Sequence, residues 1–155
     1  IILNMTKALF GAGCFWGIEE YYRKLEGILD TKVGYSGGHT KYPTYEDVCT
    51  GLTEHAEVVK LEYDENIISY EDIINHFWKC HDPTQINRQG YDIGRQYRSV
   101  IFYHNEKQKE VALNSKKKKQ TTIDKNIVTE IVPSQEFYLA ENYHQLYIKK
   151  RVLTE

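Results

Sequence analysis

Residues 11–17 read Gly11-Ala12-Gly13-Cys14-Phe15-Trp16-Gly17, so a cysteine lies between glycines and directly precedes two large aromatic residues. Before this stretch, residues 6–10 have the composition of a short strand. After it, apolar side chains recur with the spacing of one helical face, at Ile18, Tyr21, Tyr22 and Leu25. The pattern predicts that Cys14 lies where a strand turns into a helix.

A cysteine at a helix start is a candidate nucleophile. Backbone N–H groups at a helix N-terminus are unpaired and carry the positive end of the helix dipole, which favours an anion such as a thiolate. The thiolate is the reactive form of cysteine. The alternative is that Cys14 is a small buried apolar residue and that the glycines only allow a tight turn. Glycines beside an aromatic pair suit a sulfur exposed to a pocket better than a core, so we favour the nucleophile.

The composition bounds the function. The chain has 155 residues, which predicts one domain over residues 1–155 with a sizeable core. Its 20 basic and 22 acidic residues give a formal charge of −2, which disfavours nucleic acid or a membrane surface as the main partner. No membrane-spanning run or secretory leader is recognisable, so we expect a cytoplasmic protein. Residues 1–4 precede Met5 and are expected to carry no function.

The cysteines lie at positions 14, 49 and 80, an odd number without close pairing. This pattern fits a reducing compartment better than a disulfide framework. The C-x-x-C spacing of a zinc site is missing as well. We therefore expect neither a metal nor another cofactor, and interpret Cys49 and Cys80 as buried or partly buried thiols.

The remaining chain alternates between strand and helix patterns. Strands are expected over residues 28–38, 55–63, 97–104 and 127–132, and helices over residues 70–78 and 106–120. Residues 39–51 are predicted as a loop with a helical turn near 45–49, and residues 82–96 as a polar loop. The spacing of Leu139, Tyr143, Leu146 and Tyr147 suggests a terminal helix. This order predicts an α/β (α+β) two-layer sandwich in which helices pack on a mixed sheet.

Glu57 is the most informative polar residue outside residues 11–17. Its position in the strand puts its side chain on the face of Val59, Leu61 and Tyr63. A carboxyl group removed from water has a raised pKa and can hold a proton near neutral pH. The alternative is an edge position with the carboxyl group in solvent. Asp92, Tyr97 and His144 are less specific polar candidates, and Phe15 and Trp16 could form the wall of a small apolar pocket.

Motifs over nearly the whole chain resemble those of a known family. They occur in the order Gly13-Cys14-Phe15-Trp16-Gly17, Gly34-Tyr35-Ser36-Gly37-Gly38, Pro43-Thr44-Tyr45, Gly51 through His55-Ala56-Glu57, Phe77-Trp78 with His81-Asp82-Pro83, Gln89-Gly90 with Asp92, Gly94-Arg95-Gln96-Tyr97-Arg98-Ser99, and Ala140-Glu141-Asn142-Tyr143-His144-Gln145. In this series the chain resembles the A-type peptide methionine sulfoxide reductases, which reduce one epimer of oxidised methionine.

The resemblance implies a ferredoxin-like core and thiol-dependent reduction of methionine (S)-sulfoxide, free or in proteins, as a repair of oxidative damage. It implies that Cys14 attacks the sulfoxide sulfur and becomes a sulfenic acid, and that Glu57 supplies a proton to the oxygen. It further implies that Tyr45 and Tyr97 hydrogen-bond this oxygen. The residues expected to bind the substrate are Phe15, Trp16, Asp92 and His144.

The chain departs from many relatives in having no cysteine after Cys80. In those relatives a C-terminal cysteine attacks the sulfenic acid. We therefore expect an external thiol reductant, of the glutaredoxin and glutathione type or thioredoxin, acting on a monomeric enzyme. Some short family members carry selenocysteine at the position of Cys14, and the sequence leaves that possibility open.

Two other functions remain open from the residues alone. One is a thiol peroxidase or cysteine hydrolase, in which Cys14 would pair with a histidine among His39, His55, His81 and His144. The other is a non-catalytic module that binds oxidised or intact methionine in the same aromatic pocket.

Overall fold

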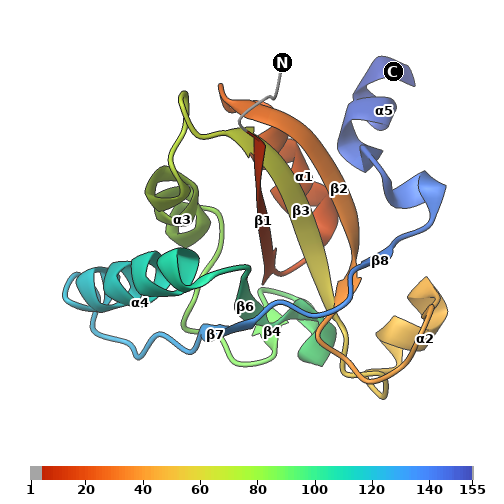
Figure 1. Cartoon of the computed structure of the whole chain (residues 1–155). Coiled ribbons are helices and arrows are strands. Elements are labelled where there is room, and N and C mark those ends of the chain that lie inside the picture. The colour runs from red at the N-terminus through yellow and green to blue at the C-terminus, as the bar shows by residue number, and fades with distance from the viewer. Residues whose placement is uncertain (1–4, 155) are drawn as a thin grey trace.

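A six-stranded mixed sheet forms the centre of the computed structural model, which describes residues 5–154 (Figure 1). Its strand order is β7-β6-β1-β3-β2-β8. The bounds of these strands are β1 Met5–Ala12, β2 Ile28–Ser36, β3 Ala56–Asp64, β6 Ser99–Tyr103, β7 Glu130–Pro133 and β8 Tyr138–Leu139. A separate hairpin consists of β4, Arg88–Gln89, and β5, Asp92–Ile93.

Five α-helices accompany the sheet in the described range, with two short 3₁₀ helices. They are α1 Phe15–Arg23, α2 Tyr45–Cys49, α3 Tyr70–Lys79, α4 Glu106–Gln120, α5 Tyr147–Thr154, η1 Arg95–Tyr97 and η2 Asn142–His144. Within residues 5–154, no helix has the length and apolar character needed to cross a membrane.

The core of the sheet has ferredoxin-like topology, as expected. The strands β6, β1, β3 and β2 are neighbours in this order and each adjacent pair is antiparallel. Helix α1 connects β1 to β2, and α3 lies between β3 and β6 in the chain, which gives the β-α-β-β-α-β order of that fold. β7 adds a parallel strand at one edge and β8 an antiparallel strand at the other.

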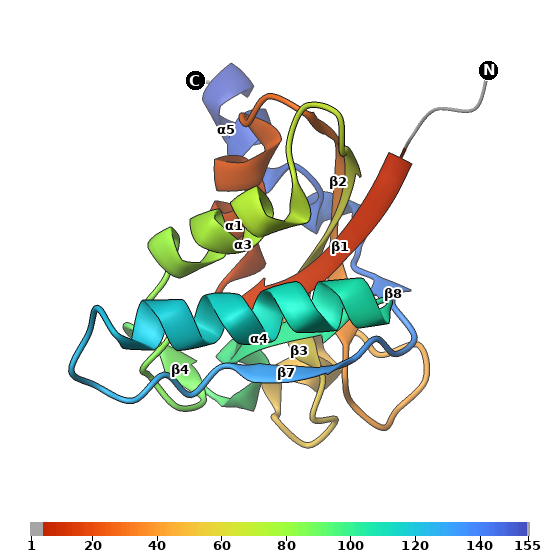
Figure 2. The same cartoon turned by 60° about the vertical axis from the view of Figure 1, so that its left-hand side comes forward.

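The helices α1 and α3 cover one face of the sheet because each has a continuous apolar face. Ile18 and Tyr22 of α1 pack with Ile73 and Phe77 of α3 against strand residues such as Phe10. The other face has a smaller apolar cluster made of Leu9, Ala56, Val58, Val100 and Phe102. Figure 2 shows α4 beside α3 and above β7, on the outside of the molecule. The two-layer α+β prediction is confirmed.

Three parts of the sequence prediction are wrong. The strand expected over residues 127–132 begins at Glu130 and includes Pro133, which an edge strand tolerates. The expected polar loop over residues 82–96 contains the β4–β5 hairpin. The terminal helix begins only at Tyr147, because Leu146 has a left-handed backbone with φ 52°. Residues 138–146 form β8, η2 and turns instead.

Candidate active site

Cys14 occupies the junction between β1 and α1, where it is the N-cap residue of the helix. The preceding Gly13 has φ +99°, which L side chains rarely adopt. A Cβ atom on Gly13 would also lie 2.8 Å from the Cβ of Gln89. The predicted strand-to-helix position of Cys14 is therefore confirmed, and the glycine before it is required both by the turn and by close packing.

The environment of the Cys14 thiol does not favour a resting thiolate. Burial raises its pKa to about 11, and the carboxyl groups of Glu57 and Asp92 raise it further. The backbone N–H groups of Trp16 and Gly17 act in the opposite direction, as expected at a helix start. The helix start acts on the thiol in the predicted direction, but it does not produce a thiolate, because desolvation outweighs the N–H groups. Cys14 holds its proton at neutral pH.

Glu57 lies inside the protein on the apolar face of β3. Its side chain is 2 % exposed, and its Oε1 accepts a hydrogen bond of 3.1 Å from the backbone N–H of Phe15. Burial raises the pKa of Glu57 to about 8; the Phe15 bond lowers it and the charge of Asp92 raises it. The solvent-exposed alternative is wrong. Glu57 is protonated at neutral pH and is positioned at the start of the helix that carries Cys14.

The aromatic residues after Cys14 form a packed group with the C-terminal segment. The indole ring of Trp16 stacks on Tyr147 with centroids 3.9 Å apart, and its Nε1–H donates to Nδ1 of His144 at 2.9 Å. Phe15 is 1 % exposed, and its ring lies 5.8 Å from Tyr35 and 5.2 Å from His144. Trp16 is the more accessible of the two, while Phe15 belongs to the core beneath it.

Two tyrosines and a glutamate connect this group to α2. The carboxylate of Glu141 accepts a 2.8 Å bond from the Tyr35 hydroxyl and a 2.9 Å bond from the backbone N–H of Tyr45. The hydroxyl of Tyr45 hydrogen-bonds the Cys49 thiol. Sequence reasoning missed Tyr35 and Glu141 as site residues. Tyr35 shares a face of β2 with the buried Val33, which was a usable signal. Glu141 lies in a segment whose helical spacing was misleading, and only its tertiary contacts reveal its role.

Tyr97 and Asp92 interact electrostatically with the groups around Cys14 and Glu57. Burial raises the pKa of Tyr97 to about 12, and the charges of Glu57, Cys49 and Asp92 add to that rise. Asp92 is exposed and pairs with Gln89 in the β4–β5 hairpin. The predicted residues Cys14, Phe15, Trp16, Tyr45, Glu57, Asp92, Tyr97 and His144 therefore gather in one region, with Asp92 at its rim.

The histidines that could serve as a base for Cys14 have other partners. His39 bonds the carbonyl of Leu52, His55 bonds Gly38 and Thr40, and His81 bonds Phe77 and Ser99. His144 accepts from Trp16, and burial lowers its pKa. These contacts favour an acid-assisted cysteine over a cysteine–histidine pair.

The two other cysteines differ from each other. Cys80 lies at the end of α3, where its thiol donates to the carbonyl of Phe77 at 3.3 Å and burial raises its pKa to about 12. Cys49 ends α2 and is exposed, so the expectation of a buried or partly buried thiol is wrong for it. Helix α2 is short and Val48 alone is buried in it, which leaves the last residue at the surface.

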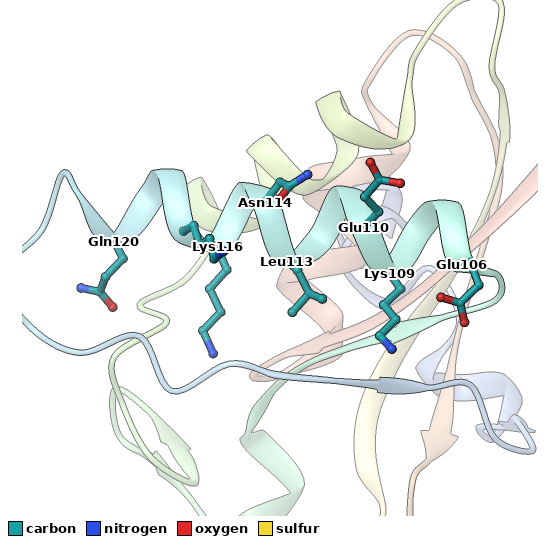
Figure 3. A pocket seen from close by; sticks show the side chains of 8 residues that line it. Glu106, Lys109, Glu110, Leu113, Asn114, Lys116 and Gln120 are labelled. Carbon is teal, nitrogen blue, oxygen red and sulfur yellow. The ribbon is translucent and has the colours of Figure 1, made fainter.

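A hollow of about 550 Å³ runs along α4, away from the β1–α1 junction (Figure 3). Figure 3 shows Lys109, Leu113 and Lys116 on one side of this helix and Glu110 and Asn114 on the other. Its lining residues all belong to α4 and include neither cysteine nor histidine. This surface has no thiol and is separate from the candidate active site.

Comparisons with known proteins agree with this geometry. A family model described as "Peptide methionine sulfoxide reductase" matches residues 6–154. The chain is 58 % identical over 150 residues to a "Peptide methionine sulfoxide reductase MsrA" of Methanosarcina acetivorans, covering 96 % of this chain and 80 % of that one.

Solved structures are similar as well. Reduced Mxr1 of Saccharomyces cerevisiae has a TM-score of 0.92 and 37 % identity, over 96 % of this chain and 87 % of Mxr1. The structure of Mxr1 in complex with Trx2 has a TM-score of 0.67 and 26 % identity, over 95 % of this chain and 89 % of the matched chain.

The arrangement predicts the ionisation of Cys14. Glu57, with a pKa of about 8, is a carboxylate over the range in which Cys14 titrates near 11, and the like charge opposes the thiolate. Glu57→Gln removes this charge and should lower the pKa of Cys14. The rate of Cys14 alkylation by iodoacetamide, measured by mass spectrometry at a series of pH values, gives the pH midpoint of Cys14 ionisation. Glu46→Gln is the control and should leave it unchanged. An unchanged or higher midpoint in Glu57→Gln would contradict this electrostatic description.

Proposed function

This chain belongs to the peptide methionine sulfoxide reductase family and is an oxidoreductase that reduces methionine sulfoxide, and we propose that Cys14 is the sulfur that attacks the substrate. The observation that carries the proposal is the bond between the Phe15 N–H and Glu57, which brings a protonated acid to the residue after Cys14. We further propose that residues 1–155 act as one catalytic domain, as a monomer in the cytoplasm. The three free cysteines of the chain fit a reducing compartment.

The proposed chemistry transfers one oxygen atom. The sulfur of Cys14 forms a bond to the sulfoxide sulfur as the sulfoxide oxygen takes the proton of Glu57. The protonated oxygen then bonds to the Cys14 sulfur as its bond to the substrate sulfur and the bond between the two sulfurs break, so that methionine leaves and a sulfenic acid remains. The proton lost by Cys14 returns to Glu57. The substrate sulfur gains two electrons, the Cys14 sulfur loses two, and the acid is regenerated.

The hydroxyl groups of Tyr45 and Tyr97 are proposed to donate hydrogen bonds to the sulfoxide oxygen as negative charge develops on it. Burial, as the main cause, raises the pKa of Tyr97 to about 12 and also raises that of Tyr45, so both phenols keep their protons at neutral pH. Donors fixed before the reaction stabilise developing charge without reorganisation. This requirement explains why two phenols border a buried carboxyl group.

The substrate methyl group is proposed to contact Trp16 and Phe15. The stacking on Tyr147 and the hydrogen bond to His144 hold the Trp16 ring in one orientation, and an apolar wall of fixed orientation positions a methyl group by contact. Asp92 and His144 are proposed to orient the rest of the substrate, which is methionine (S)-sulfoxide, free or within a protein.

The sulfenic acid is proposed to be reduced by an external thiol. Two thiols convert it to a thiol and water while they form a disulfide. Cys80 is held against Phe77, and burial raises the pKa of its thiol. The thiol of Cys49 is partly shielded from water although the residue is exposed, and this desolvation is the main cause that raises its pKa. Few thiolates are therefore present to attack the sulfenic acid on Cys14. A glutaredoxin or glutathione type of donor acts on such a sulfenic acid directly. The complex of Mxr1 with Trx2 supports thioredoxin as the other candidate donor.

The nucleophile is tested by replacing each cysteine in turn. Cys14→Ser should abolish conversion of an (S)-sulfoxide peptide with dithiothreitol, because a hydroxyl cannot form the sulfenic acid. The matched variants Cys49→Ser and Cys80→Ser should keep most of the activity. Methionine formation measured by chromatography decides the result, with circular dichroism as the folding control. Turnover by Cys14→Ser, or its loss in folded Cys49→Ser, would contradict the assignment.

The recycling step is tested without a reductant. After reaction with excess methionine sulfoxide, the enzyme should lose one free thiol and give a dimedone adduct on Cys14, because Cys49 and Cys80 both have raised pKa values and so supply few thiolates to resolve the sulfenic acid. Thiol counting and peptide mapping provide the measurement. Loss of two thiols together with a disulfide from Cys14 to Cys49 or Cys80 would show internal resolution instead.

A further inference from the structure

Glu141 connects three parts of the site that are far apart in the sequence. It is half-buried and directly precedes η2. Its carboxylate accepts the hydroxyl of Tyr35 at 2.8 Å and the backbone N–H of Tyr45 at 2.9 Å, and its backbone carbonyl accepts the N–H of His144 at 2.9 Å. Burial raises the pKa of Glu141, but its hydrogen bonds, first that from the Tyr45 N–H, outweigh burial and keep the pKa below its ordinary value. An ionised carboxylate therefore joins β2, α2 and η2.

The Tyr35 end of this connection is fixed to the sheet. Tyr35 is fully buried and lies directly opposite Glu57 in the pairing of β2 with β3, so the two side chains are on the same face. The chain next to Glu141 is fixed to the same strand, because the N–H of Ala140 donates to the carbonyl of Val33 at 3.0 Å. Glu141 therefore has a defined position relative to the proposed acid, Glu57.

The helix at the other end of the connection is short and has little buried surface. Tyr45 is the first residue of α2, a helix of five residues in which Val48 alone is buried. The capping box of Thr44 and Asp47 bonds only within the start of the helix. The N–H of Tyr45 is one of the groups that a helix start leaves without a partner inside the helix, and it donates to Glu141. This bond attaches the start of α2 to the sheet.

We propose that Glu141 is a positioning residue that holds the start of α2, and with it the phenol of Tyr45, at a fixed place relative to Glu57. The inference rests on the proposed function, since it needs Tyr45 to donate a hydrogen bond to the sulfoxide oxygen. The backbone N–H and the side chain of Tyr45 belong to one residue, so a shift of the helix start moves the hydroxyl as well. A hydrogen-bond donor displaced by about 1 Å loses much of its effect on the transition state.

The test separates the reach of the Glu141 side chain from its charge. Glu141→Asp keeps the charge but shortens the side chain by one methylene, about 1.5 Å, so the carboxylate no longer reaches both Tyr35 and Tyr45. Glu141→Gln keeps the reach, because its amide oxygen accepts the Tyr45 N–H and its NH2 group donates to the Tyr35 hydroxyl oxygen. Methionine formation is measured in a single turnover without reductant, with urea unfolding as the folding control. Glu141→Asp should slow this step by about tenfold and Glu141→Gln by less than about threefold.

Double variants show whether Glu141 acts through Tyr45. Tyr45→Phe removes the hydroxyl, so adding Glu141→Asp to it should slow the step by less than about twofold. The matched control is Glu19→Asp, because Glu19 also accepts one backbone N–H, from Leu146 at 2.8 Å, and one hydroxyl, from Thr31 at 2.7 Å, and both partners lie outside α2. Any effect of Glu19→Asp should multiply with that of Tyr45→Phe.

Three results would overturn the proposal. The first is a folded Glu141→Asp enzyme that is as fast as the unmodified one. The second is a pair of effects from Glu141→Asp and Tyr45→Phe that multiply, since Glu141 would then act elsewhere. The third is a Glu141→Gln enzyme slower than Glu141→Asp, since charge rather than reach would then matter. Glu141→Ser takes the place of Glu141→Asp should the latter not fold. A Tyr45→Phe enzyme with the full rate would contradict the proposed role of Tyr45 itself, and the inference with it.

Discussion

The hydrogen bond from the Phe15 backbone N–H to the Glu57 carboxyl group is the contact on which the site depends. It joins the first residue of α1 to β3 across the sheet and accounts for two features at once: a carboxyl group is kept from water, and it is held beside Cys14. The bond is possible because β1 and β3 pair closely, with Phe10 opposite Val59. Gly11 belongs to the same constraint, since a Cβ atom there would lie 2.8 Å from the carbonyl oxygen of Glu57.

The second constraint comes from the C-terminal segment, which is distant in sequence but covers α1 and β2. The side chain of Gln145 accepts from the N–H of Val33 and donates to its carbonyl, both at 2.9 Å, and so replaces a strand partner. Glu19 of α1, 1 % exposed, accepts the N–H of Leu146 at 2.8 Å. These buried bonds fix the segment that carries Tyr147 against Trp16. The orientation of Trp16, the proposed wall of the substrate site, is therefore a property of the whole fold, because leaving these partly buried groups unpaired would be costly.

Local patterns were sufficient for the parts of the site that depend on periodicity. The glycines and helical spacing located Cys14 at a strand-to-helix junction, and alternation in β3 located Glu57 on the buried face. The resulting pKa of Cys14 could not be read in this way, because it depends on burial by residues from other elements. The terminal helix was placed too early for a similar reason. Leu139, Tyr143 and Leu146 have helical spacing, but this segment bonds to β2 and α1 and cannot also form helical bonds. The role of Glu141 follows only from its tertiary contacts.

The central claim is that burial keeps Glu57 protonated beside Cys14 at neutral pH. Titration of the Glu57 carboxyl group by NMR, with ¹³C-labelled glutamate and Glu57→Gln to assign the signal, measures this directly. The account predicts a midpoint near pH 8, and a lower midpoint in Asp92→Asn because the neighbouring negative charge is removed. A midpoint near 4.5, the ordinary value for glutamate, would show that the carboxyl group is ionised at neutral pH and would contradict its role as the proton donor.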